Sequence, residues 1–91
     1  MTFKGQQMKV SIDISMYPLQ SEFEKPITAF IERLAREQRV NIVRTELSTQ
    51  VYGEYDIVMG LLTDEMKAVF ETMPQSVFVI KIVGEDRKGR F

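Results

Sequence analysis

The sequence predicts an α+β domain in which a four-stranded antiparallel sheet carries two helices on one face. The apolar residues recur at every second position, then at every third or fourth, and this alternation happens twice along the chain. Two of the changes coincide with Pro18 and Pro74. The resulting order is β-α-β-β-α-β, which is the ferredoxin-like arrangement. In that arrangement the first and third strands are central, and the fourth strand flanks the first.

The first strand is predicted at residues 8–17 and the first helix at residues 22–38. Apolar side chains occupy alternate positions of the strand: Val10, Ile12, Ile14 and Met16. Pro18 ends the strand because it cannot donate to a sheet ladder. The helix has an apolar stripe at a spacing of three and four, and either Ser21 or Glu22 is expected to begin it. The arginines near its end, at positions 33, 36 and 39, are expected to be a solvated helix end and not a binding patch.

The second half of the chain is predicted to contain a hairpin, a helix and a last strand. Residues 40–53 form the two strands of the hairpin, and its tip is expected within Thr45–Ser48. The helix at residues 55–73 is expected to be capped by Glu54 and Asp56, and Pro74 ends it. The strand at residues 76–83 is apolar on both faces except for Lys81.

Length and composition indicate one ordinary domain. The chain has 91 residues, of which 8–84 are expected to fold, with flexible termini at 1–7 and 85–91. Twelve basic and 13 acidic residues nearly balance, which argues against a nucleic-acid partner. No apolar run is long enough for a membrane helix or a signal peptide, so we expect no membrane partner and a cytoplasmic location.

One face of the sheet is left uncovered by the helices, and its residues are unusual. If Val10, Ile12 and Ile14 face the helices, the opposite face carries the intervening residues of the first strand. The third and fourth strands contribute further residues to this face, and setting the first and fourth strands side by side places Asp13 within cross-strand reach of Lys81. Such a face is typical of an oligomer interface, with or without a small-molecule pocket, more than of a solvated surface. The residues concerned are Asp13, Ser15, Tyr17, Gln50, Tyr52 and Lys81.

The sequence gives little support for catalysis, metal binding or nucleic-acid binding. The chain contains neither Cys nor His, which excludes thiolate nucleophiles, the usual zinc sites and histidine relays. The segment after the first strand has no glycine-rich phosphate loop, and the acidic third strand does not suit an RNA-recognition module. No pair of carboxylates has an acid–base spacing. We therefore expect a protein that is not an enzyme and carries no cofactor.

The sequence resembles the YkoF-like family of thiamine- and hydroxymethylpyrimidine-binding proteins. The resemblance spans residues 8–83, and its specific elements lie within VSIDISMYPL at 10–19 and LSTQVYGEYDIVM at 47–59. It implies a ferredoxin-like fold, no catalysis, and binding of thiamine or its pyrimidine half. Asp13 stands where the family pattern suggests Glu, and Met16 where it suggests an aromatic residue. Because a single repeat is present, the resemblance also implies association between chains, as a homodimer or homotetramer.

A thiamine pocket needs a carboxylate for the cationic ring, polar partners for the aminopyrimidine and an aromatic surface. The candidate ligand-binding residues are Asp13, Ser15, Tyr17, Ser48, Thr49, Gln50, Tyr52 and Lys81. An alternative for Ser48 and Thr49 is a purely structural place in the hairpin turn. The alternative for the whole protein is an ACT-like regulatory or interaction module, whose open sheet face serves only assembly.

Overall fold

Six elements follow one another in the predicted order in the computed structural model, which describes residues 8–89. They are β1 (Lys9–Tyr17), α1 (Glu24–Ala35), β2 (Asn41–Arg44), β3 (Thr49–Glu54), α2 (Tyr55–Thr72) and β4 (Val77–Val83). Residues 1–7 and 90–91, part of the termini expected to be flexible, lie outside the described residues. Within the described part of the chain, no helix is long and apolar enough to cross a membrane.

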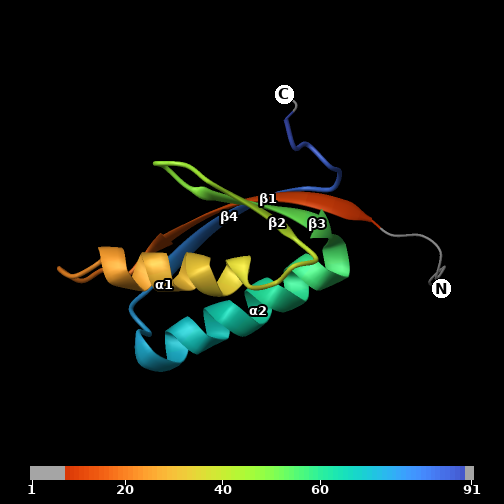
Figure 1. Cartoon of the computed structure of the whole chain (residues 1–91). Helices are drawn as coiled ribbons and strands as arrows, with labels where there is room; N and C mark the ends of the chain where they lie inside the picture. The colour runs from red at the N-terminus through yellow and green to blue at the C-terminus, as the bar shows by residue number, and fades with distance from the viewer. Residues whose placement is uncertain (1–7, 90–91) are drawn as a thin grey trace.

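The four strands form one antiparallel sheet in the order β2-β3-β1-β4, and both helices cover the same face (Figure 1). The predicted ferredoxin-like fold is therefore confirmed, with β1 and β3 in the centre and β4 beside β1. The register places Asp13 opposite Gln50 on β3 and opposite Lys81 on β4. Residues directly opposite in a ladder share a face of the sheet, so these three side chains lie on the same side.

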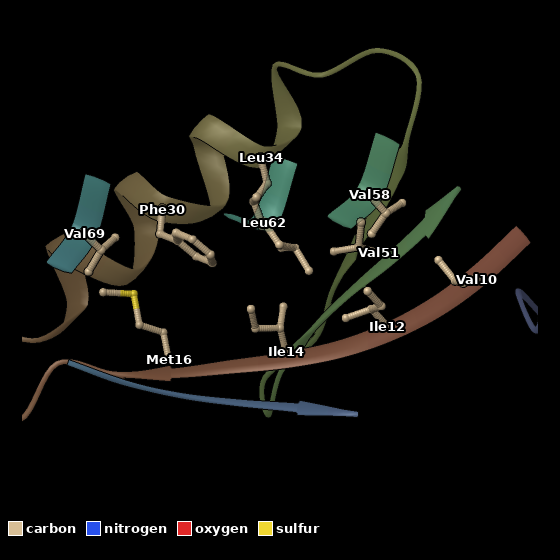
Figure 2. Close-up of a cluster of buried hydrophobic side chains, with 10 residues drawn as sticks. All are labelled: Val10, Ile12, Ile14, Met16, Phe30, Leu34, Val51, Val58, Leu62 and Val69. Carbon is tan, nitrogen blue, oxygen red and sulfur yellow. The ribbon is translucent and has the colours of Figure 1, made fainter. Parts of the chain in front are cut away.

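The core lies between the sheet and the two helices, and Figure 2 shows its ten buried apolar side chains. The even-numbered positions of β1 that were predicted to face the helices do so, because all are at most 7% exposed. Phe30 of α1 lies with its ring centroid 5.1 Å from that of Phe78, which in turn lies 5.4 Å from Phe70 of α2. The ten are Val10, Ile12, Ile14, Met16, Phe30, Leu34, Val51, Val58, Leu62 and Val69.

Helix α1 is shorter than predicted at both ends. Its N-cap is Phe23, without a side-chain cap, so the assignment of Ser21 or Glu22 as the first residue was wrong. At the other end, the amides of Arg36 and Glu37 donate to carbonyls three residues back instead of four, at 3.3 and 3.1 Å. This tightening of the last turn ends the α-helix at Ala35.

The arginines near the end of α1 are paired more than the sequence suggested. The Nε of Arg33 donates to Glu65 Oε1 of α2 at 2.6 Å, so this side chain joins the two helices instead of being solvated. Arg39 lies beyond the helix and pairs with Glu37. At the start of α2, Glu54 takes the N-cap position but makes no side-chain cap bond, while Asp56 places a carboxylate in the first turn.

The tip of the β2–β3 hairpin lies at Thr45–Ser48, as predicted, although it has no glycine. Thr45 organises the turn by hydrogen bonds. Its amide donates to the Ser48 carbonyl at 2.9 Å, and its hydroxyl oxygen accepts from the amides of Leu47 and Ser48. A threonine side chain can organise a turn in this way by imitating a backbone acceptor. The hairpin is therefore held at a defined position relative to its neighbours.

Ser76, between α2 and β4, is a buried residue whose hydroxyl has no hydrogen-bond partner within residues 8–89. A buried polar group without a partner costs about 1–3 kcal/mol. Ser76→Ala should therefore raise the free energy of unfolding, by about 1 kcal/mol, as measured by urea denaturation. Ser48→Ala is a suitable comparison, because the Ser48 hydroxyl has a partner in Asp13. A loss of stability in Ser76→Ala would show that its hydroxyl is satisfied.

Candidate functional site

A hollow of about 740 Å³ lies where β1 ends, α1 begins and the β2–β3 hairpin turns. β1 contributes its last residues, from Ile14 onward, and the connecting segment continues the wall through Pro18 to Gln20. The first turns of α1 form a second wall and residues 44–49 form a third. Three segments that are far apart in the sequence thus border one open hollow, and the turn at Thr45 forms part of one side.

Four of the eight candidate residues line this hollow: Ser15, Tyr17, Ser48 and Thr49. The other four lie elsewhere on the uncovered face of the sheet, where the register places Gln50 beside Asp13 and Asp13 beside Lys81. Tyr52 lies farther along β3, opposite Ser11. The structure therefore divides the predicted site into a group at the hollow and a group on the open sheet.

Thr49 differs from the other candidates because it lies on the helix-facing side of the sheet. It stands opposite Ile14, a core residue, and is only 4% exposed. Its hydroxyl makes no hydrogen bond with any of the residues 8–89, although the side chain lines the hollow. The hydroxyl oxygen is not among the fully buried atoms, so it is accessible at the hollow and can donate to or accept from a molecule placed there.

Asp13 connects the two groups. Its Oδ1 accepts a hydrogen bond from the hydroxyl of Ser48, which lines the hollow. Lys81, although opposite Asp13, makes no ion pair with it in the described structure. Farther along β3, the Tyr52 hydroxyl donates to Gln50 Oε1 at 3.1 Å. The Asp13 carboxylate is therefore held toward the hairpin tip by Ser48, and Lys81 does not hold it.

The α1 wall contains functional candidates that the sequence analysis did not single out. Glu24, Ile27, Thr28 and Ile31 all line the hollow and are spaced as one stripe of a helix. Glu24 and Thr28 are polar residues on the same stripe as Ile27 and Ile31, and these polar positions were the signal in the sequence that this face is not all core. Sequence alone could not show that this part of the stripe extends beyond the core and faces an open space.

The mouth of the hollow has apolar edges and charged residues of both signs. Leu19, Phe23 and Leu47 are 66%, 52% and 89% exposed, respectively, and all three line it. Leu19 has a φ of +49°, a left-handed conformation that is uncommon for a side chain of this size. Such strain is concentrated at functional sites, so the conformation of this loop supports a role for the hollow.

The charges at the hollow belong to two carboxylates, Glu24 and Glu46, and one guanidinium, that of Arg44. Among the described residues, none of the three takes part in an ion pair. No group of three acidic side chains within residues 8–89 is close enough together to hold a metal ion. The hollow offers apolar contact, hydroxyl groups and a small excess of negative charge.

Comparison with known proteins gives structural likeness only. No family model and no curated protein matches the sequence. A Thermotoga maritima protein assigned provisionally to thiamine biosynthesis or salvage superposes with a TM-score of 0.75, at 18% identity over 91% of this chain and 88% of its own. A hypothetical protein of Methanocaldococcus jannaschii gives a TM-score of 0.74, at 19% identity over 86% of this chain and 81% of its own.

A third solved structure, from Streptococcus pneumoniae, has 28% identity and a TM-score of 0.67, over 86% of this chain and 89% of its own. The likeness is one of fold. It supports the YkoF-like resemblance at the level of architecture, and the Thermotoga protein connects that architecture with thiamine. A shared fold does not establish a shared ligand, because the site residues decide binding.

Proposed function

We propose that this protein binds thiamine or its hydroxymethylpyrimidine moiety in the hollow beside α1, without catalysing a reaction. The observation that supports this most directly is Thr49, a residue only 4% exposed whose side chain lines the hollow and offers it a hydroxyl group. The resemblance of residues 8–83 to thiamine-binding proteins names the ligand class. The fold shared with the Thermotoga protein is consistent with it.

The size and composition of the hollow suit such a ligand. Pockets for small molecules have volumes of about 300–1,000 Å³ and combine apolar walls with a few polar groups. Ile14, Ile27 and Ile31 supply apolar contact for a flat ring. Thr49, Thr28 and Ser48 supply hydroxyl groups for the ring nitrogens and the amino group, and Glu24 and Glu46 supply charge of the sign that attracts a thiazolium cation.

The absence of catalysis is proposed from the residues available. A chain without Cys or His lacks the two most common activated nucleophile and base combinations. Ser48 donates to the Asp13 carboxylate, but among the described residues no histidine or lysine completes a relay of the usual kind with this pair. The protein would instead hold the ligand for transport, salvage or buffering, as a homodimer or homotetramer.

Calorimetric titration with thiamine tests the proposal and the position of the site. Thr49→Val removes the hydroxyl at almost constant volume and should weaken thiamine binding about tenfold, since a buried hydrogen bond to a ligand is worth about 1–2 kcal/mol. Thr63→Val is the matched control, because Thr63 is exposed on α2 and away from the hollow. The control should bind thiamine like the original protein.

Asp13→Asn in the same titration distinguishes the two groups of candidate residues. Asp13 contacts the hollow only through Ser48, so a ligand in the hollow should respond more strongly to Thr49→Val than to Asp13→Asn. A loss of at least tenfold in Asp13→Asn, with Thr49→Val unchanged, would place the ligand on the open sheet face. No heat with thiamine or hydroxymethylpyrimidine would reject the proposed function.

A second candidate function is an ACT-like interaction module, and the exposed side chains of β4 favour it. Val77, Val79 and Val83 are 42%, 49% and 40% exposed, and the register places Val77 beside Tyr17 and Val79 beside Ser15. An apolar strip of this kind on an uncovered sheet suits a protein contact. A stable oligomer in light scattering, without thiamine binding, would support this function over the first.

A further inference from the structure

A second hollow, of about 320 Å³, lies at the opposite end of β1 from the first. It is lined by Lys9 at the start of β1, by Tyr52 of β3, by Arg39 of the α1–β2 connection and by Asn41 at the start of β2. The segment that follows β4 closes the remaining side with Asp86 and Lys88. None of these residues lines the first hollow, so the two spaces are separate.

Ser11 holds the segment after β4 against the sheet. Its hydroxyl donates to the Glu85 carbonyl at 2.8 Å and its oxygen accepts from the Arg87 amide at 2.7 Å. Ser11 is only 7% exposed as a result, although its register opposite Tyr52 places it on the face that the helices leave uncovered. Residues 85–87 were assigned to a flexible terminus from the sequence. Here they are fixed by two hydrogen bonds, and they carry Lys88 to the hollow.

Three cationic side chains from distant parts of the chain therefore surround one small space: Lys9, Arg39 and Lys88. The charge of Arg39 is already balanced, because its Nε and NH2 groups donate to the two carboxylate oxygens of Glu37 at 2.9 and 2.8 Å. These hydrogen bonds lower the pKa of Glu37 from 4.5 to about 2, so the pair is ionised at neutral pH.

The two lysines are not paired in this way, although the Asp86 carboxylate lines the same hollow and offsets one of their charges. Neither Lys9 nor Lys88 takes part in an ion pair within residues 8–89. The nearby carboxylate of Asp86 accepts a hydrogen bond from the Lys88 amide at 3.0 Å and so supports the turn of the backbone. Two ammonium groups and one carboxylate leave an excess of positive charge at the hollow, and this excess would attract an anion.

We propose that the second hollow binds a small phosphate-bearing anion, with the ammonium groups of Lys9 and Lys88 as its main contacts. Asn41 also lines the hollow, and its side-chain amide can donate a further hydrogen bond. The volume lies at the lower end of the range for ligand pockets and suits pyrophosphate or a phosphorylated group better than a large cofactor. Ser11 is a positioning residue, because it holds the segment that carries Lys88.

NMR titration with inorganic pyrophosphate at low ionic strength tests the site. The amides of Lys9, Asn41 and Lys88 should shift with a saturable dependence, while those of Thr28 and Thr49 in the first hollow should not. The double variant Lys9→Ala/Lys88→Ala should weaken pyrophosphate at least about tenfold. The matched control Lys25→Ala/Lys67→Ala removes two exposed helical lysines and should leave the affinity unchanged.

The Ser11→Ala variant tests the positioning role. It should weaken pyrophosphate several-fold and increase amide hydrogen exchange in residues 85–88, while thiamine binding stays unchanged. Equal affinity in Ser11→Ala would reject the role of Ser11.

Two outcomes would overturn the phosphate site. One is that Lys9→Ala/Lys88→Ala binds pyrophosphate as tightly as the original protein. The other is that sulfate causes the same chemical-shift changes as pyrophosphate, in Lys9→Ala/Lys88→Ala and in Lys25→Ala/Lys67→Ala alike. Failure of thiamine to bind would affect the proposed function only, because the two hollows share no residue.

Discussion

Replacing Phe30 by alanine should lower the free energy of unfolding by about 3–5 kcal/mol, the range for large aromatic side chains removed from a core. Phe30 is 2% exposed and contacts the ring of Phe78, so it joins α1 to β4 at the edge of the sheet. A domain of 91 residues is expected to have a total stability of about 5–14 kcal/mol, so this loss would be a large fraction of it.

Urea unfolding followed by circular dichroism measures this loss as a lower midpoint with an unchanged slope. Phe23→Ala is the matched control, because Phe23 is 52% exposed at the edge of the first hollow and should change stability by no more than about 0.5 kcal/mol. Equal midpoints for the two variants would mean that Phe30 does not belong to the core.

The fold could be predicted from the sequence because its signals are local. Alternation in β1 and the helical stripe around Phe30 each depend on residues within one element, and the order of elements then limits the topology. The ends of the elements were less predictable. Helix α1 ends at Ala35 because the backbone tightens there, and nothing in the side chains of residues 36–38 announces this.

The candidate site could be predicted only in part, for a physical reason. Alternation along a strand shows which face a residue occupies, and it placed Asp13 and Gln50 correctly on the same side. It does not show what covers that face or where a space remains open. Those depend on contacts between distant segments, such as Ser11 with Glu85 and Ser48 with Asp13. Thr49 shows the same limit. It lines the hollow together with the first turns of α1, and the pattern of its own strand does not show that α1 lies there.

Substituting alanine at Gly53 and at Gly60 should change stability in opposite directions. A Cβ on Gly53 would lie 3.1 Å from Val58 Cγ2 and 3.2 Å from Val40 Cγ1, both closer than ordinary contacts. Val58 is fully buried in a close-packed core, so we expect Gly53→Ala to destabilise the protein by about 1–3 kcal/mol through overpacking. Gly53 is thus required where α2 and the α1–β2 connection approach β3.

Gly60 lies within α2, and a Cβ there would meet nothing within 4 Å. Gly60→Ala should stabilise the protein by about 0.5–1 kcal/mol, because alanine loses less conformational freedom than glycine in a helix. Thermal unfolding should therefore show the two variants on opposite sides of the original protein, since about 1 kcal/mol corresponds to about 4–8 °C in a domain of this size. A melting temperature for Gly53→Ala at or above that of the original protein would mean that Val58 and Val40 can separate, and that the close approach of α2 to β3 is not a constraint on this fold.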